Sequence, residues 1–405
     1  MTFRQAEEYL LGLELFGMRF GLDRMHKLMT VLGLPQRRFA SIHVVGTNGK
    51  SSTVRFCAAI LERHGLRTGS YTSPHLRSFR ERIEVGEEPV PERDFAAAVA
   101  RAAHAAELVD RTAAPEDRVT QFEALTAAAY HELARRGVEV AVIEAGLGGR
   151  FDATSVIPSK VQALTNVGLE HTRWLGPTIA DIAEEKLAVV RDHGTLVVGD
   201  LDPDARAVAE RVAAARHARL VQSSAPGPFQ RRNLAVAAKT AEAFLGRPLD
   251  RAAVEDAAAA TRIPGRLDVV AQRPLIIHDG AHNPSGARAL AEALPGVTGG
   301  RRPVVGAISV LEDKDAAGML RELLPCLDRA VFTRCRNPRA LSPATLESFA
   351  AKLEAPPYET VADPGAAVAR ARELAGPDGA VVATGSIYLI ADLVRERTDA
   401  RASTL

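Results

Sequence analysis

A glycine-rich turn that carries a lysine and two serines is the strongest chemical signal in the sequence. The apolar run Ser41–Val45 leads into Gly46-Thr47-Asn48-Gly49-Lys50-Ser51-Ser52, and a helical pattern follows. Glycines let the backbone turn sharply and point successive N–H groups inward, and the next helix N-terminus adds partial positive charge. The Lys50 ammonium can pair with the β- and γ-phosphates of a nucleotide, and the Ser51 hydroxyl can hold Mg²⁺. Although Val44 replaces the first glycine of the GxxxxGK[ST] pattern, these residues predict a phosphate-binding loop rather than an ordinary turn.

The elements that would position this loop alternate between short β-branched runs and longer Ala- and Leu-rich helical patterns. Such alternation predicts an α/β fold, with a P-loop-type, mostly parallel sheet in an N-terminal domain and a smaller, Rossmann-like α/β C-terminal domain. The expected strands are 41–45, 138–144, 161–166, 194–198, 274–278, 303–308, 330–334 and 380–383. The expected helices include 52–64, 95–108, 121–136, 179–190 and 285–294. Ligands bind at the carboxyl ends of parallel strands, so the residues that follow each strand are the candidates for a site.

Length and charge narrow the class of protein. With 405 residues the chain is too long for one compact domain. An irregular stretch around Pro264-Gly265 precedes a boundary near residue 272, which gives expected domains 1–272 and 273–405. Lys and Arg total 51 against 50 Asp and Glu, a balance that argues against binding of duplex DNA. The three cysteines form no CxxC pair, which argues against a disulfide framework or a structural zinc site.

No feature of the sequence indicates a membrane. The first residues place acidic side chains within their apolar pattern, unlike a signal peptide. The sequence has no uncharged apolar run of about 18 residues, the length that a membrane span needs. We expect a cytoplasmic protein whose partners are small molecules rather than nucleic acid or a lipid bilayer. Residues 397–405 are expected to fray.

Ordered motifs along nearly the whole chain resemble one family. The loop Gly46–Ser51 resembles the phosphate loop of the Mur ligase superfamily, and the further motifs are similar to the folylpolyglutamate synthase and dihydrofolate synthase family within it. They are Gly21-Leu22-Asp23-Arg24-Met25, Thr72-Ser73-Pro74-His75-Leu76, Glu81-Arg82-Ile83, Phe122-Glu123-Ala124-Leu125-Thr126, Glu144-Ala145-Gly146-Leu147-Gly148-Gly149-Arg150-Phe151-Asp152-Ala153-Thr154, Gly168-Leu169-Glu170-His171-Thr172, Asp279-Gly280-Ala281-His282-Asn283-Pro284 and Thr384-Gly385-Ser386-Ile387-Tyr388. Each motif is weak by itself, but their shared order from residue 21 to residue 388 is specific.

The resemblance implies an ATP-dependent ligase. ATP, the co-substrate, would phosphorylate a carboxylate of dihydropteroate or of a folate. The amino group of L-glutamate would then displace phosphate from the acyl phosphate and leave an amide, ADP and phosphate. The first domain would bind ATP and the folate, and the second would be the glutamate-ligase domain. The family also implies a monomer and two Mg²⁺ ions, and it allows a monovalent cation as a further cofactor.

The resemblance also assigns roles to individual residues. The catalytic residues would be Lys50, Lys186, Asp279 and His282. The residues that bind ATP would be Thr47, Asn48, Gly49, Lys50, Ser51, Ser52, Asn233, Arg266 and Asp279. The ligands of magnesium would be Ser51, Ser73, Glu144, His171 and Lys186, the last as a carbamate formed with CO₂. The folate would contact Phe122, Arg150, Asp152, Ala153, Thr154 and the segment Gly21–Met25, and glutamate would contact His282 and Ser386.

Several of these residues also have purely structural interpretations. Ser73 would form a turn, His171 would cap a helix or pack in the core, and Lys186 would pair with a glutamate on an exposed face. Asp279 and Asn283 would cap the helix 285–294. Glu144 ends a strongly apolar strand, which favours delivery of its carboxylate to the ligand edge, and carboxylate oxygens suit Mg²⁺. A carbamate on Lys186 requires a neutral amine, so its pKa would have to be lowered.

Two other functions stay open as alternatives. A cell-wall Mur ligase would need a UDP-binding domain before the phosphate loop, and only 45 residues precede Gly46. A nucleotide switch that hydrolyses ATP without ligation would not need the motifs of the second domain. Within the folate family, residues 152–154 favour an enzyme with both the dihydrofolate synthase and the folylpolyglutamate synthase activities.

Three arginines suggest one hypothesis beyond the resemblance. Arg334, Arg336 and Arg339 follow an expected strand of the second domain. We hypothesise that they attract the carboxylates of glutamate or of a polyglutamyl tail. The alternative is a solvated run of surface charge.

Overall fold

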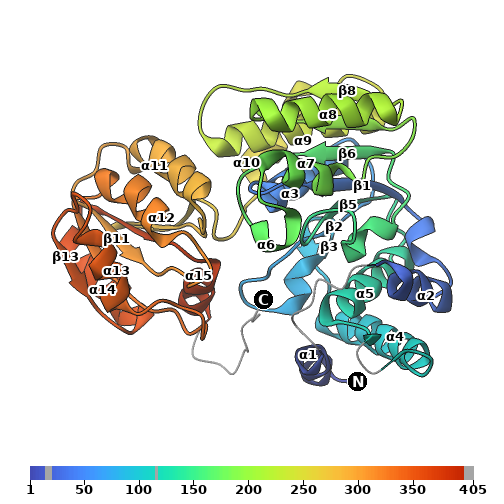
Figure 1. Ribbon diagram of the computed structural model, residues 1–405, viewed down its shortest axis with the longest axis horizontal. Coiled ribbons are helices and arrows are strands. Elements are labelled where there is room, and N and C mark those ends of the chain that lie inside the picture. Colours follow the sequence, from blue (N-terminus) through green and yellow to red (C-terminus); the bar gives the residue numbers. More distant parts are fainter. Residues whose placement is uncertain (14–20, 115–116, 396–405) are drawn as a thin grey trace. The chain divides into compact units, whose positions relative to one another are not determined.

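The computed structural model describes residues 1–13, 21–114 and 117–395 (Figure 1). The chain divides into two compact units, the first formed by described residues of 1–74 and 79–261, and the second by residues 75–78 and those from 262 onward. The division after Thr261 lies upstream of the boundary expected near residue 272. The reason is that strand β9 (Asp268–Gln272) pairs with β10 (Leu275–His278) inside the second unit. The segment 397–405, which we expected to fray, lies outside the described residues.

An eight-stranded sheet forms the centre of the first unit, in the order β4-β3-β2-β5-β1-β6-β7-β8. Its strands are β1 (Ala40–Val45), β2 (Thr68–Tyr71), β3 (Ile83–Val85), β4 (Glu88–Pro89), β5 (Val140–Glu144), β6 (Val161–Leu164), β7 (Thr195–Val198) and β8 (Arg219–Gln222). The strands from β2 to β8 in this order run parallel, whereas β3 and β4 add antiparallel at the edge beside β2. The parallel strands therefore end at one edge, where ligands bind in such sheets.

Helices cover both faces of this sheet (Figure 1). They are α1 (Phe3–Gly12), α2 (Asp23–Val31), α3 (Lys50–Arg63), α4 (Glu92–Asp110), α5 (Gln121–Arg135), α6 (Thr172–Leu175), α7 (Ile179–Leu187), α8 (Pro203–Ala215), α9 (Phe229–Leu245) and α10 (Arg251–Ala260), with short 3₁₀ turns η1 (Pro35–Arg37), η2 (Phe79–Arg82) and η4 (Ala153–Val156). Helix α3 packs against α9 and α10 on one face. On the other face α4 and α5 share a core with Ile143, and α7 and α8 share one with Val45.

The second unit contains a six-stranded sheet in the order β13-β12-β11-β14-β10-β9, parallel except for β9. Its further strands are β11 (Val304–Ile308), β12 (Arg329–Phe332), β13 (Tyr358–Thr360) and β14 (Ala380–Thr384). Its helices are α11 (Pro284–Thr298), α12 (Ala316–Leu323), α13 (Pro343–Ala350), α14 (Pro364–Ala375) and α15 (Ile387–Val394), with the short turn η5 (Leu324–Cys326). Helices α11, α12 and α13 share one apolar core with the sheet, and α14 and α15 share the other. Successive residues of β10 alternate between these cores, with Ile276 in one and Ile277 in the other, as a pleated strand requires.

The structure confirms the α/β class and every strand expected from the sequence. The short strands β2, β3, β4, β8, β9 and β13 were not expected. Strand β2 reads Thr-Gly-Ser-Tyr and β13 reads Tyr-Glu-Thr, so neither contains the apolar run that identifies a buried strand. Their place in the sheets depends on pairing with distant strands, which composition does not reveal.

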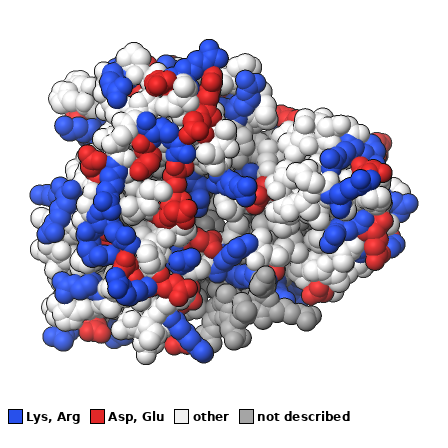
Figure 2. Space-filling model, turned by 180° about the vertical axis from the view of Figure 1, so that it is seen from behind, with Lys and Arg blue, Asp and Glu red and all other residues white. Residues whose placement is uncertain are grey.

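The surface matches the near-neutral charge of the chain. Figure 2 shows Lys and Arg interspersed with Asp and Glu over the face that it draws, without a large area of one sign. Across the described residues, no helix combines the length and the apolar character that a membrane crossing requires.

Candidate active site

The turn after β1 has a backbone that only glycine can follow at two positions. Gly46 has φ 151° and Gly49 has φ 83°. A Cβ on Gly46 would lie 1.9 Å from Oγ1 of Thr165, and a Cβ on Gly49 would lie 2.4 Å from Oδ1 of Asn233. The turn then passes directly into α3, whose first residue is Lys50. The local geometry is that of a tight loop at a helix N-terminus, which favours anions.

Residues that follow β6 hold this turn in place. The backbone N–H of Asn48 donates to Oδ1 of Asn166 at 2.9 Å, and the hydroxyl of Thr165 donates to the carbonyl of Asn48 at 2.6 Å. The N–H of Gly168 donates to Oγ1 of Thr47 at 3.0 Å. Thr165 and Asn166 were not among the expected site residues, because they were assigned to the end of the expected strand 161–166, whereas β6 ends at Leu164.

Two lysine side chains converge on one carbonyl of the turn. Nζ of Lys50 donates to the carbonyl oxygens of Gly46 at 3.0 Å and Thr47 at 3.2 Å, and Nζ of Lys186 donates to Gly46 at 2.9 Å. Lys186 is buried at the last turn of α7. Burial, followed by repulsion from Lys50, lowers its pKa to about 7, although Glu170 and Asp152 act in the opposite direction. The exposed ion pair that we considered as an alternative for Lys186 is therefore wrong.

Glu144 joins the turn to the neighbouring strands. Its position opposite Val44 places its side chain on the α3 face of the sheet, and Oε1 accepts a hydrogen bond from Oγ of Ser51 at 3.1 Å. Oε2 accepts from the backbone N–H of Ser73 at 3.2 Å. These groups supply carboxylate and hydroxyl oxygens, which are ligands that Mg²⁺ accepts together with several waters.

The other expected metal ligands are less closely gathered. His171 has φ 53°, stands at the N-cap position of α6 and has a side chain that is 42% exposed. Its Nε2 lies 3.9 Å from Oε1 of Glu170. Within residues 1–13, 21–114 and 117–395, no group of three or more His, Cys, Asp or Glu side chains could hold a metal ion. Of the expected metal ligands, Glu144 and Ser51 are hydrogen-bonded to each other, and these two could hold an ion that retains much of its water shell.

The loop after β5 carries the residues expected to contact a folate. Phe122 is half-buried in the first turn of α5, and its ring lies 6.2 Å from that of Tyr71. Arg150 is exposed and its Nε donates to Oε1 of Glu185 at 2.8 Å. In contrast, Asp152, Ala153 and Thr154 are buried, with exposures of 6%, 6% and 0%. Thr154 is thus completely enclosed by other residues of the first unit, and its direct contact with a folate stays a prediction.

Within the segment Gly21–Met25, which is expected at the folate, Arg24 anchors the start of α5. Arg24 is buried, and its Nε donates to both carboxylate oxygens of Glu123 at 3.0 and 3.2 Å. Its Nη1 also pairs with Asp117. Glu123 in turn accepts from the N–H of Thr120 at 2.9 Å and completes a capping box there. Arg24 thus fixes the helix turn that carries Phe122.

The second unit presents its expected residues after β10 and β14. Asp279 is buried and accepts the N–H groups of Leu267 and Ala281, both at 2.9 Å. Burial raises the pKa of Asp279, and Arg266 opposes this shift. Nη1 of Arg266 donates to the carbonyl of Gly280 at 2.9 Å.

The expected glutamate contacts lie on adjacent loops of this unit. Nδ1 of His282 is 2.9 Å from the carbonyl oxygen of Gly280. A Cβ on Gly280 would lie 2.6 Å from Cδ1 of Ile387, so the two loops touch. Ser386 is buried and caps α15 by accepting the N–H of Tyr388 at 3.2 Å. The helix α11 is capped by Asn283, whose Oδ1 accepts the N–H of Gly286 at 2.8 Å.

The three arginines after β12 do not form one cluster of exposed charge. Arg334 and Arg336 are exposed, whereas Arg339 is partly buried and pairs with Asp313 at 3.4 Å. The backbone N–H of Arg336 donates to Oδ2 of Asp392 at 2.7 Å. This arrangement favours the surface-charge alternative for Arg334 and Arg336.

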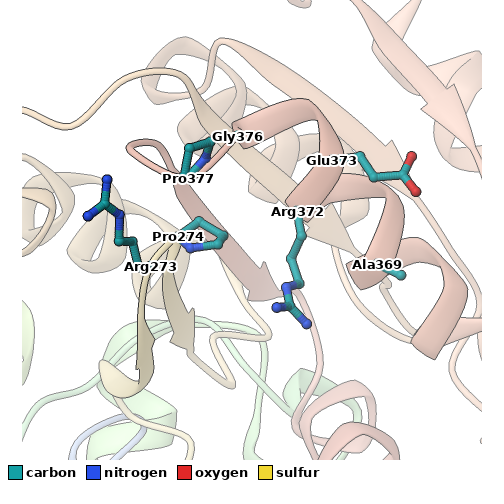
Figure 3. A pocket seen from close by; sticks show the side chains of 7 residues that line it. All are labelled: Arg273, Pro274, Ala369, Arg372, Glu373, Gly376 and Pro377. Atoms are coloured by element: carbon teal, nitrogen blue, oxygen red, sulfur yellow. The ribbon is translucent and has the colours of Figure 1, made fainter.

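A hollow of about 420 Å³ lies elsewhere on the second unit (Figure 3). Arg273 and Pro274 line it just before β10, together with Arg372, Glu373 and Pro377 from α14 and the turn before β14. The hollow is therefore at the amino ends of these strands, opposite the edge that carries Asp279. Parallel sheets bind ligands at the carboxyl ends, so we do not include this hollow in the candidate site.

Two family models match the chain. The model described as "Mur ligase middle domain" matches residues 44–243, and the model described as "Mur ligase, glutamate ligase domain" matches residues 265–387. The interval between the matches contains the division after Thr261 that the fold shows.

Comparisons with individual proteins and solved structures agree with these two family models. The dihydrofolate synthase/folylpolyglutamate synthase of Mycobacterium tuberculosis is 35% identical, over 79% of this chain and 75% of that protein. A probable bifunctional folylpolyglutamate synthase/dihydropteroate synthase of Haloferax volcanii is 34% identical over 97% of this chain, which spans half the length of that protein. Crystal structures of Mycobacterium tuberculosis folylpolyglutamate synthase complexed with ADP and AMPPCP match with a TM-score of 0.90 and 32% identity, over 98% of this chain and 99% of that one.

Proposed function

Because the chain belongs to the folylpolyglutamate synthase and dihydrofolate synthase family of the Mur ligase superfamily, we propose that it joins L-glutamate to dihydropteroate and to the γ-carboxylate of a reduced folate, using ATP. The observation that carries this proposal is the convergence of Lys50, Lys186 and the Glu144–Ser51 pair on one glycine turn at a helix N-terminus. Phosphoryl transfer to a carboxylate brings anions together, and such a transfer depends on positioned positive charge.

The phosphates of ATP would lie on the turn between Gly46 and Ser52. The two glycines allow the backbone N–H groups to approach the phosphates, and Lys50 supplies a full positive charge. Asn233, buried against Gly49, would face the nucleotide from α9. The similar M. tuberculosis protein has been crystallised in complex with ADP and AMPPCP, which supports nucleotide binding by this chain.

Glu144 and Ser51 would hold Mg²⁺ beside the phosphates. When bound, the ion would neutralise part of the charge that develops on the transferred phosphoryl group. The depressed pKa of Lys186, about 7, leaves a large fraction of neutral amine at physiological pH. A neutral amine is the form that reacts with CO₂ to give a carbamate and a proton, so the microenvironment supports this modification.

The second unit would bind the incoming glutamate. His282 and Ser386 lie on adjacent loops at the carboxyl edge of its sheet, and Arg266 adds positive charge beside Asp279. Glutamate must present a neutral α-amine to attack the acyl phosphate, and the product is an amide with release of phosphate. The family match described as "glutamate ligase domain" over residues 265–387 supports this division of labour.

The test is a glutamate-dependent ligation assay with two acceptors. Purified protein receives ATP, Mg²⁺ and L-glutamate with either dihydropteroate or tetrahydrofolate, and both ADP and product mass are measured. We expect ADP release to require glutamate and each product to gain one glutamyl residue. Lys50→Met should abolish turnover, whereas Lys239→Met, which changes a half-exposed lysine paired with Glu242, should not.

Two outcomes would overturn the proposal. ADP release at the same rate without glutamate and acceptor would indicate a nucleotide switch. Glutamate-dependent turnover with a UDP-linked peptide, and none with either pteridine acceptor, would indicate a cell-wall ligase.

A further inference from the structure

A buried chain of three polar side chains runs from the central strand β1 to the loop after β5. Nε2 of His43 lies 2.8 Å from Oγ1 of Thr154, and the same hydroxyl bonds to Oδ1 of Asp152. His43 and Thr154 are completely buried, and Asp152 is 6% exposed. Polar groups are rarely placed this deep without a structural purpose, because each costs free energy unless it is hydrogen-bonded.

The direction of these hydrogen bonds follows from the donor count. The carboxylate of Asp152 accepts the N–H of Leu147 at 2.8 Å and the N–H of Thr154 at 3.0 Å. A carboxylate that accepts several N–H groups is an acceptor only, so the single hydroxyl proton of Thr154 is donated to it. Nε2 of His43 must then carry a proton and donate to Thr154. Among the described residues, Nδ1 of His43 has no hydrogen-bond partner, which is consistent with a neutral ring whose second nitrogen is an unprotonated acceptor.

The chain of bonds ends on the loop that connects β5 to the expected folate residues. Gly146 and Leu147 come directly after Glu144-Ala145, and Asp152 binds the N–H of Leu147. A Cβ on Gly146 would lie 2.6 Å from Cζ of Phe122. The backbone at Gly146 therefore packs directly between the carboxylate of Asp152 and the ring of Phe122.

A second bond fixes the other end of the same segment. The hydroxyl of Tyr130, on α5, donates to the carbonyl of Thr154 at 2.9 Å. Helix α5 thus carries both Phe122 and the tyrosine that anchors η4. Movement of Thr154 would be transmitted to Asp152 and then to Leu147, because Thr154 and Asp152 are buried and hydrogen-bonded to each other and the N–H of Leu147 lies 2.8 Å from the Asp152 carboxylate.

We propose that His43 and Thr154 are positioning residues, which do not touch the substrate but hold Asp152 and the Gly146–Leu147 turn in the shape that binds the aromatic part of the acyl acceptor. This inference rests on the proposed function, because it names which part of that substrate the turn receives. It gives Thr154 a different role from the direct folate contact implied by the sequence resemblance. It also gives a role to His43, which carried none.

The main test compares two replacements of one hydroxyl. Thr154→Val keeps the shape and removes the hydroxyl, whereas Thr154→Ser keeps the hydroxyl. We expect the valine variant to raise KM for dihydropteroate or tetrahydrofolate by at least about tenfold, as the loss of supporting hydrogen bonds around a site commonly does, with KM for ATP changed by less than about twofold. The serine variant should restore the acceptor KM. Thr240→Val, which removes another fully buried hydroxyl, one bonded to its own helix, is the matched control and should change neither constant.

A second measurement does not depend on activity. Hydrogen exchange of the Leu147 amide should be faster in Thr154→Val than in the wild type and normal in Thr154→Ser, because only the valine removes the bond that orients Asp152. If Thr154→Val does not fold, the pair His43→Leu and His43→Gln serves instead, since the glutamine amide can replace the Nε2–H donor.

Equal increases of both KM values, or an unchanged Leu147 exchange rate in a folded valine variant, would overturn the positioning role. These results would leave the proposed ligase activity intact. Absence of glutamate ligation by the wild type, with the expected exchange pattern, would instead refute the proposed function and leave the buried chain of bonds as a purely structural clamp.

Discussion

Replacement of Lys186 by methionine should stabilise the protein, and by an amount that depends on pH. Lys186 is 4% exposed and shares the carbonyl of Gly46 with Lys50. Burial and repulsion from Lys50 lower its pKa from 10.5 to about 7. The folded state therefore disfavours the charged lysine relative to the unfolded chain, whereas methionine has a similar length and no charge.

The magnitude follows from the difference between the two pKa values. Below pH 7 the lysine is protonated in both states, so the fold bears the whole penalty, which is about 4 to 5 kcal/mol at about 1.4 kcal/mol per pKa unit. Above pH 7 the folded lysine loses its proton while the unfolded lysine keeps it until pH 10.5. The unfolded state then binds more protons, so wild-type stability rises with pH and the penalty shrinks to about 2 kcal/mol at pH 9.

The quantity that tests the reasoning is the pH dependence of the difference in unfolding free energy between Lys186→Met and the wild type. Loss of the hydrogen bond to Gly46 will cost the variant about 1 kcal/mol at every pH, so it cancels when two pH values are compared. We expect the stability gained by Lys186→Met to be about 3 kcal/mol larger at pH 6 than at pH 9.

Urea unfolding of the wild type and the variant at several pH values measures this difference. The buffers should lack magnesium and CO₂, because a metal ion or a carbamate would change the charge at Lys186. The control Lys239→Met changes a half-exposed lysine, and its unfolding free energy should differ from that of the wild type by the same amount at every pH measured. Parallel stability curves for wild type and Lys186→Met would show that Lys186 keeps an ordinary pKa, and the electrostatic reasoning would be wrong.

Two further substitutions test the residues that support the site. Arg24→Met should destabilise the protein by about 3 kcal/mol in urea unfolding, because it leaves the carboxylate of Glu123 buried without the arginine that neutralises it. The control Arg4→Met removes an exposed ion pair with Glu8 and should cost less than about 1 kcal/mol. Equal losses of stability in the two variants would contradict the anchoring role of Arg24. Gly49→Ala should weaken ADP binding in calorimetry by at least about tenfold, because the new Cβ would lie 2.4 Å from Oδ1 of Asn233. The control Gly246→Ala is also at positive φ, but its Cβ would lie in open space, so it should cost about 1 kcal/mol of stability and leave ADP affinity unchanged. Loss of ADP binding in both variants would indicate a general folding defect.

The sequence was sufficient to predict the fold class and the position of the glycine turn that carries Lys50. The apolar strand before Gly46 and the Gly-Lys-Ser run identified the turn by local chemistry alone, and the structure places it at the end of β1. The apolar run before Glu144 likewise predicted a carboxylate at the same sheet edge, where Ser51 is 3.1 Å away. Both expectations depended on residues that are neighbours in the chain.

Other parts of the candidate site depend on partners that are far apart in the sequence. Arg24 and Glu123 are 99 residues apart and His43 and Thr154 are 111 apart, so no periodicity could pair them. The resemblance implies folate contacts for both the Arg24 segment and Thr154. Because the side chains of Arg24 and Thr154 are buried, we propose that these two residues support the site from behind its surface. A motif shared within a family can therefore mark the support of a site as well as its contacts.

Asp152 connects the two electrostatic features of the first unit. Its carboxylate accepts the last hydrogen bond of the series that runs from His43 through Thr154. It is also one of two acidic groups that raise the pKa of Lys186, whereas burial and Lys50 lower it. The Coulomb energy between two buried charges is large because the protein interior screens it weakly, and it falls as the distance between the charges increases. The bonds that fix the Asp152 carboxylate thus also fix its influence on the lysine at the phosphate loop. Loosening Thr154 should therefore change mainly the shape of the turn at Gly146, with a smaller downward effect on the pKa of Lys186, because Asp152 follows burial, Lys50 and Glu170 among the causes of that pKa shift.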